Sequence, residues 1–80
     1  MTINKAVALR ISRLLIKNNI TPYRLAVNAG LQHSTLQNIL DEKYTDIKMS
    51  TLYKIAKGFK MSVIDFLNDD LFNETNLNIE

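Results

Sequence analysis

The sequence contains no cysteine and only one histidine among its 80 residues. Without cysteine, the chain can form neither a disulfide bond nor a thiolate metal site, which fits a reducing compartment. His33 alone is too little for a histidine-ligated metal, and the carboxylates do not gather around a predicted pocket. We therefore expect no metal, no cofactor and no catalytic site, since catalytic groups need convergent partners.

Long hydrophobic runs are also missing. The first residues, MTINKAVALRISRLLIKNN, are interrupted by Arg10, Arg13 and Lys17, so they resemble neither a signal peptide nor a membrane span. Repeats and low-complexity segments are absent, and 80 residues suffice for one small core. The expectation is a cytoplasmic protein that does not contact membranes.

Basic residues are absent from the last twenty positions. Residues 1–60 contain all ten Lys and Arg against three acids, a net charge of +7, whereas residues 61–80 contain five acids. A positive body is the electrostatic pattern expected of a protein that binds phosphates. The acidic end would be kept away from phosphates or would simply aid solubility, and solubility is the favoured account of the tail itself.

Residues 21–43, TPYRLAVNAGLQHSTLQNILDEK, are expected to form two short amphipathic helices joined by a turn. Thr21 is a good N-cap, and Pro22 suits the first helical position because that position needs no N–H. Gly30 can adopt the left-handed conformation that ends a helix. The residues expected to face inward are Leu25, Ala26, Ala29, Leu36, Ile39 and Leu40.

The outer face of the second helix is polar, short-chained and nearly uncharged. It carries His33, Ser34, Gln37, Asn38 and Asp41. Amide side chains pair well with the N6/N7 edge of adenine, and a serine hydroxyl can serve several bases. These residue types leave two interpretations open, a base-reading face and an ordinary solvated helix face.

Three further helices are expected around this pair. The first covers about residues 5–18, with Val7, Ile11, Leu14 and Leu15 inward and its basic residues solvated or touching phosphate. In the next, Ser50 is the N-cap or Lys48 to Ser50 form the first turn, and the expected core residues are Met49, Leu52, Ile55, Ala56 and Phe59. The last begins at Ser62, which with Asp65 makes a short capping-box analogue, and buries Val63, Phe66 and Leu67.

A family resemblance rests on the joint spacing of residues in the helix pair. These residues are Thr21, Leu25-Ala26, Gly30-Leu31, Ser34-Thr35-Leu36, Ile39 and Lys43. The pattern resembles the helix-turn-helix of the Cro/cI-type (XRE) DNA-binding family, over about residues 5–69. It implies an all-α, compact five-helix lambda-repressor-like domain over residues 1–69, followed by an acidic tail over residues 70–80.

The resemblance implies a transcription regulator, most commonly a repressor, that reads an inverted repeat in double-stranded DNA with the second helix of the pair in the major groove. The residues implied for base contact are Gln32, His33, Ser34, Gln37 and Asn38. Those implied for phosphate contact are Thr21, Tyr23, Arg24, Lys43, Tyr44 and Lys48. Lys43 is the first choice among them, and Tyr44 could instead cover the core.

The sequence departs from the family pattern at several positions. Pro22 stands where a phosphate-binding Gln is common, and Arg24 replaces the usual Glu. Gln32 replaces a Ser or Thr N-cap, so the recognition helix is expected to be weakly capped. Glu42 stands where Gly is common, so either that helix runs on or the turn has a different shape.

Two large apolar residues, Leu71 and Phe72, follow the last expected helix and need cover. Packing within the chain is one account, and a contact in a homodimer is the slightly preferred one. The rival to a DNA-binding function is a small helical protein-interaction module, such as an antitoxin or anti-regulator, which would show no salt-dependent affinity for DNA.

Overall fold

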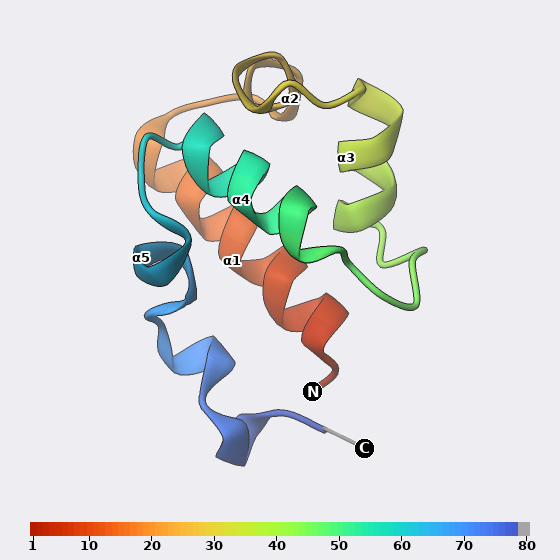
Figure 1. Cartoon of the computed structure of the whole chain (residues 1–80), viewed down its shortest axis with the longest axis vertical. Coiled ribbons are helices and arrows are strands. Elements are labelled where there is room, and N and C mark those ends of the chain that lie inside the picture. Colours follow the sequence, from red (N-terminus) through yellow and green to blue (C-terminus); the bar gives the residue numbers. More distant parts are fainter. Residues whose placement is uncertain (79–80) are drawn as a thin grey trace.

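The computed structural model describes residues 1–78 of the chain, and all regular structure in this range is helical. The elements are α1 (Ile3–Asn18), α2 (Pro22–Ala29), α3 (His33–Leu40), α4 (Met49–Gly58), α5 (Val63–Leu67) and the 3-10 turns η1 (Asp70–Phe72) and η2 (Glu74–Asn76) (Figure 1). The expected all-α architecture of five helices is confirmed. Residue 80, counted above among the acids of the tail, and residue 79 lie outside the described residues.

The ends of the first two helices follow from local capping chemistry. The Thr2 hydroxyl accepts a hydrogen bond from the Lys5 N–H, so α1 begins two residues earlier than expected. Asn19 ends this helix with a φ of 53°. Thr21 caps α2 and Gly30 ends it in the left-handed conformation, as expected from the sequence.

The first turns of α4 and α5 differ in how they are capped. The N-cap of α4 is Lys48, whose side chain makes no capping bond, so Ser50 lies in the first turn and is not the cap. Met49 was expected in the core, but its side chain is 58% exposed because it begins the helix on the solvent side. Ser62 does cap α5, accepting a hydrogen bond from the Asp65 N–H.

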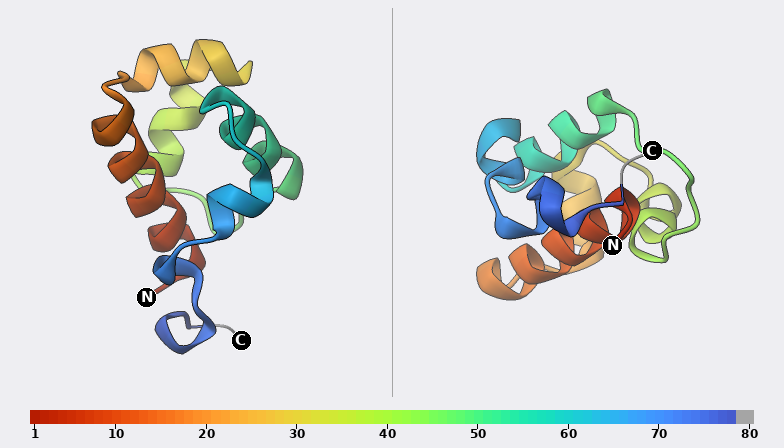
Figure 2. Two further views of the ribbon diagram at one scale, coloured as in Figure 1. Left: turned by 90° about the vertical axis from the view of Figure 1, so that its left-hand side faces the viewer. Right: turned by 90° about the horizontal axis from the view of Figure 1, so that it is seen from below.

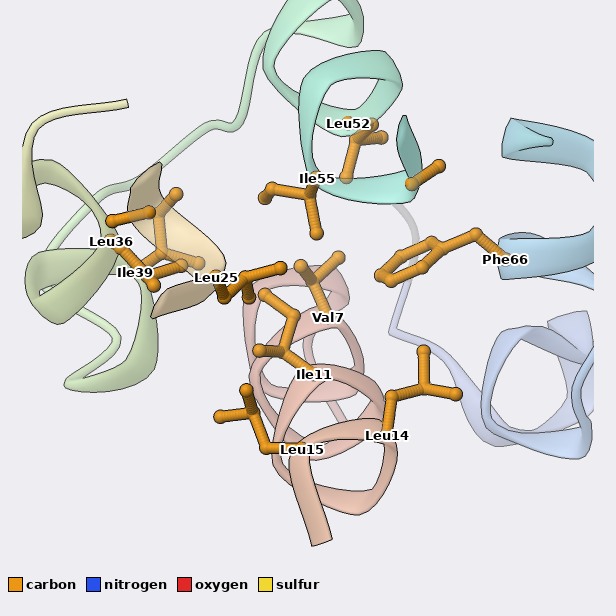
Figure 3. Packing of buried hydrophobic residues seen from close by; sticks show 12 residues of the cluster. Val7, Ile11, Leu14, Leu15, Leu25, Leu36, Ile39, Leu52, Ile55 and Phe66 are labelled. Carbon is orange, nitrogen blue, oxygen red and sulfur yellow. The ribbon is translucent and has the colours of Figure 1, made fainter. Parts of the chain in front are cut away.

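The helices enclose one hydrophobic core. Helix α2 packs against α3 and α4, α1 packs against α3 and η1, and α5 packs against α4 (Figures 1 and 2). Figure 3 shows side chains of every α-helix converging at the centre, with Phe66 entering from α5. The largest fully buried side chains are Phe66, Ile11, Leu25, Leu36, Ile39, Ile55 and Val7.

Helices α2 and α4 approach each other closely at Gly58. A Cβ atom at this position would lie 2.9 Å from Leu25 Cδ1 and 3.1 Å from Ala29 Cβ. The small side chains of α2 therefore admit the backbone of α4, as their spacing indicated. This approach fixes the first helix of the pair against the body of the domain.

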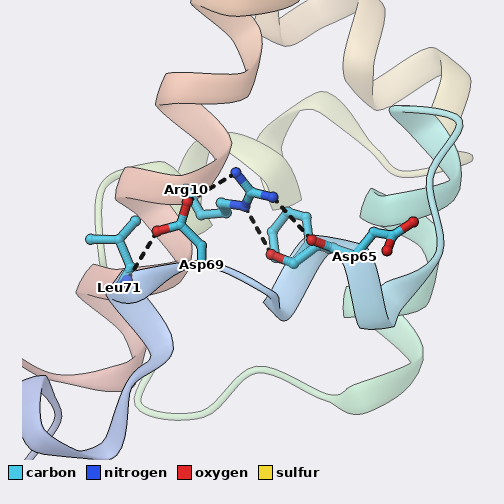
Figure 4. A network of polar contacts seen from close by, with 5 residues as sticks. Arg10, Asp65, Asp69 and Leu71 are labelled. Atoms are coloured by element: carbon cyan, nitrogen blue, oxygen red, sulfur yellow. Dashed lines mark hydrogen bonds and ion pairs between the residues drawn. The ribbon is translucent and has the colours of Figure 1, made fainter.

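Arg10 joins α1 to the end of α5 and to the segment that follows it (Figure 4). Its Nε donates to the Phe66 carbonyl at 2.8 Å, and its Nη2 donates to the Asp65 carbonyl at 3.0 Å. Its Nη1 lies 3.2 Å from an Asp69 carboxylate oxygen in a salt bridge, and the Arg10 side chain is only 14% exposed. The expectation that this residue is solvated or contacts phosphate is therefore wrong, because its donors are used inside the fold.

The segment after α5 lies against α1. Leu71 is 6% exposed and its N–H donates to Asp69, while Phe72 is half-buried with its ring centroid 6.1 Å from that of Phe66. Packing within the chain thus covers Leu71, and this side chain is not available for the dimer contact that we preferred from the sequence. Further along, the Met1 ammonium donates to the Asn76 carbonyl and the Asn78 N–H donates to the Met1 carbonyl.

Replacing Arg10 with Ala is expected to lower the free energy of unfolding by about 2 kcal/mol, because two carbonyls and a carboxylate lose a charged donor in a partly buried place. Urea denaturation followed by circular dichroism measures the change. The matched control is Arg13→Ala on the same helix. Arg13 is exposed and has no ion pair among residues 1–78, so its loss should change stability by less than about 0.5 kcal/mol. Equal effects of the two substitutions would contradict the role given to Arg10.

Candidate nucleic-acid interface

The polar face of α3 points away from the core. Leu36 and Ile39 are buried against the body, and the outer side of the same helix carries the side chains expected to contact bases. Three of these, Gln32, His33 and Ser34, are exposed. The remaining two, Gln37 and Asn38, are half-buried. The five side chains are therefore grouped on one helix and around its first turns.

The beginning of α3 lacks a side-chain cap. Gln32 occupies the N-cap position and makes no hydrogen bond to the first turn, as its residue type indicated. The first N–H groups of the helix are consequently left without a side-chain acceptor. The ring of His33 lies 5.8 Å from the ring of Tyr23, inclined by 57°, which links the first turn of α3 to the first turn of α2.

The start of α2 presents donors beside this aromatic pair. Thr21 Oγ1 accepts the Arg24 N–H at 3.1 Å, so it serves as a cap, while its own O–H can still donate. The side chains of Tyr23 and Arg24 are exposed. Helix N-termini favour anions through free N–H groups and the helix dipole, which gives this end the properties of a phosphate contact.

The loop between α3 and α4 decides one of the two alternatives that Glu42 suggested. Helix α3 does not run on, since it ends at Leu40, and Glu42 adopts the left-handed conformation in the turn that follows, with a φ of 57°. A non-glycine residue in this conformation costs about 1 kcal/mol or more. The Lys43 N–H then donates to the Asn38 carbonyl at 2.9 Å, so the turn closes directly behind α3.

The remaining loop residues expected to contact phosphate lie at the surface. Lys43 and Lys48 are exposed, whereas Tyr44 is 37% exposed and lines a surface pocket together with Ile39, so its ring partly covers the core. The Tyr44 carbonyl accepts a hydrogen bond from the side-chain amide of Asn4, which ties the loop to the start of α1.

The distribution of charge in space agrees with that in the sequence. The acidic segment containing η1 and η2 lies at the opposite end of the longest axis from α2 (Figure 1). The charge of Arg10 is paired to Asp69. The exposed basic side chains on α2 and in the loop that follows α3 are Arg24, Lys43 and Lys48.

Asp41 is the one residue of the polar face for which the sequence predicts no contact with DNA. It is exposed, forms the C-cap of α3, and its Oδ1 accepts a hydrogen bond from Gln37 Nε2 at 3.1 Å. A Gln and an Asp four positions apart on a helix are expected to meet, so this pair was visible in the sequence.

The described part of the chain offers little for other kinds of site. Residues 1–78 contain no cluster of three or more His, Cys, Asp or Glu side chains that could hold a metal ion. Within the same range, every helix is too short or too polar to cross a membrane.

Comparison with protein families gives a match to the Cro/C1-type helix-turn-helix DNA-binding domain over residues 10–70. Among solved structures, the crystal structure of the prophage Lp1 protein 11 is similar, with a TM-score of 0.80 and 27% sequence identity, covering 92% of this chain and 97% of that chain. Comparison with curated protein sequences gives no match.

Gln32→Ser should raise the free energy of unfolding by about 1 kcal/mol, because serine can accept a first-turn N–H that glutamine leaves uncapped. Gln32→Ala is the control, since it removes the amide and adds no cap. Thermal and urea denaturation of both variants check the expectation. A serine variant no more stable than the alanine variant would show that the missing cap does not lower the free energy of unfolding.

Proposed function

Because this chain belongs to the Cro/C1-type helix-turn-helix DNA-binding domain family, we propose that it is a sequence-specific transcription regulator that places α3 in the major groove of double-stranded DNA. The observation that carries this proposal is the polar face of α3, which turns away from the core and is followed by a loop that carries the exposed Lys43 and Lys48. Phosphate contacts would set the position of the domain, and the face of α3 would read the bases.

Each group of residues has a proposed part. The base-reading set is Gln32, His33, Ser34, Gln37 and Asn38. The phosphate set is Thr21, Tyr23, Arg24, Lys43, Tyr44 and Lys48. In this assignment residues 1–69 form the DNA-binding domain, while the acidic residues 70–80 stay away from the duplex. Phosphate binding at α2 then relies on the N–H groups of its first turn, since Pro22 cannot replace an amide side chain there.

We further propose that two copies bind an inverted repeat. Related by a two-fold axis, their α3 helices would enter successive major grooves about 34 Å apart. Occlusion of a promoter by such a dimer would make the protein a repressor.

A surface groove between α4 and α5 is better suited to the dimer contact than Leu71. We call it the α4–α5 groove, and it is lined by Tyr53, Lys54, Lys57, Met61, Ser62, Val63 and Ile64. Ile64 is 76% exposed, which is unusual for an aliphatic side chain beside other apolar residues. Lys54 and Lys57 border the groove on α4, and the Asp65 side chain points away from Arg10 (Figure 4), so a two-fold copy could pair opposite charges around the apolar centre.

The separation of base reading from phosphate binding can be tested directly. Gln37→Ala or Asn38→Ala should cost about 1 to 3 kcal/mol at a site selected from random DNA and little on unselected DNA. Lys43→Ala should weaken both kinds of binding and reduce the salt slope by about one. Fluorescence titrations at two salt concentrations measure both effects. A salt-independent or undetectable affinity would favour the protein-interaction module instead.

The proposed dimer contact predicts that Ile64→Ser converts the dimer to a monomer. The molar mass measured by sedimentation should then correspond to one copy, for the free protein or for its complex with an inverted repeat. The loss of a central apolar side chain on each copy provides the physical reason. Ile16→Ser is the matched control, because Ile16 is 82% exposed on α1 and lies outside the groove. A wild-type protein that stays monomeric with and without DNA would refute dimerisation. If Ile64→Ser still forms a dimer, the α4–α5 groove is not the dimer contact.

A further inference from the structure

Asp41 forms the C-terminal end of the outward face of α3, one turn beyond Gln37 and past the last residue of the proposed base-reading set. Counted at 100° per residue, its direction falls between those of Ser34 and Gln37. Its carboxylate receives the Gln37 Nε2 hydrogen bond at 3.1 Å, and both side chains reach solvent. Asp41 is therefore placed to fix the orientation of the Gln37 amide.

The hydrogen bond limits what the Gln37 amide can offer. A glutamine amide has two N–H donors and one acceptor oxygen, whereas an ionised carboxylate only accepts. Turning the amide over would bring its oxygen against the Asp41 carboxylate and lose the bond. The bound orientation therefore leaves one N–H and the carbonyl oxygen free to face a ligand.

The two purines differ in this respect. In the major groove adenine presents a donor at N6 beside an acceptor at N7, whereas guanine presents acceptors at both O6 and N7. One donor and one acceptor match adenine, while guanine needs the N–H that Asp41 already holds. We propose that Asp41 is a positioning residue that strengthens the preference of Gln37 for adenine over guanine. This inference rests on the proposed function, since it requires α3 to lie in the major groove.

A purely structural role for the pair makes a different prediction. A side-chain bond four positions apart would support the helix by a small amount and would leave base preference unchanged. Removing a negative charge from this face would raise affinity for every DNA sequence alike. A change confined to one base position separates the proposed role from both effects.

The experiment begins with sites selected by the wild-type protein from a random DNA pool, and Gln37→Ala identifies the position that Gln37 reads. Duplexes with adenine or guanine at that position are then titrated with wild type, Asp41→Ala and Asp41→Asn. We expect the wild type to prefer adenine by about ten-fold and Asp41→Ala to prefer it by about three-fold, because the released amide still fits adenine but can also turn both N–H groups toward guanine. Asp41→Asn removes the same charge, but its carbonyl oxygen can still accept the Gln37 N–H, so it should retain more of the preference. Thermal unfolding and random-DNA titrations establish that both variants are folded and share the effect of the lost charge.

Several results would overturn the inference. Asp41→Ala could keep the full preference for adenine, or the Ala and Asn variants could change it equally, which would assign the effect to charge. Failure of Gln37→Ala to alter any single position would remove the reading role on which Asp41 depends. If the wild type enriches no sequence, the proposed function itself fails. If it enriches a site read by Gln37 and only the Asp41 result is negative, the proposed function stands without this refinement.

Discussion

Burial of Leu36 and Ile39 is the interaction on which the candidate interface depends. Helix α3 has only eight residues and no side-chain cap, so it would be marginal in water by itself. Packing against α1 and α2 supplies its stability and also its direction, since burying these two side chains turns the polar side of the helix outward. The buried face of α3 therefore stabilises the helix, and the opposite face of the same two turns carries the base-reading residues that we propose.

The close approach at Gly58 extends this dependence to α2. With Ala29 and Gly58 in near contact, α2 cannot move relative to α4 without opening the core. The N-terminus of α2 and the beginning of α3 are joined by the Tyr23 and His33 rings at the surface. The phosphate-binding and base-reading parts that we propose thus belong to one rigid unit, which is the arrangement that a fixed register on DNA requires.

Sequence reasoning succeeded where structure is determined locally. Thr21, Gly30 and Ser62 act through atoms within three or four positions, so their residue types indicate the helix ends. It failed where a side chain has a distant partner. The position of Arg10 in its own helix predicts a solvated basic residue. No residue near it in the chain indicates that its guanidinium will bind carbonyls of α5. The candidate site was predicted by residue type and family likeness, whereas the partner of Gln37 was overlooked despite its regular spacing.

The contacts of Arg10 also bear on the order in which the chain assembles. They join positions 55 to 59 residues apart, and the Met1 to Asn76 hydrogen bond spans 75 positions. The cost of closing such loops precedes any stabilisation they bring, while the helix pair closes within two dozen residues. The helix-turn-helix can therefore belong to the folding nucleus, with the C-terminal segment docking late and detaching early. Arg10 would then govern the lifetime of the native state more than the speed at which it forms.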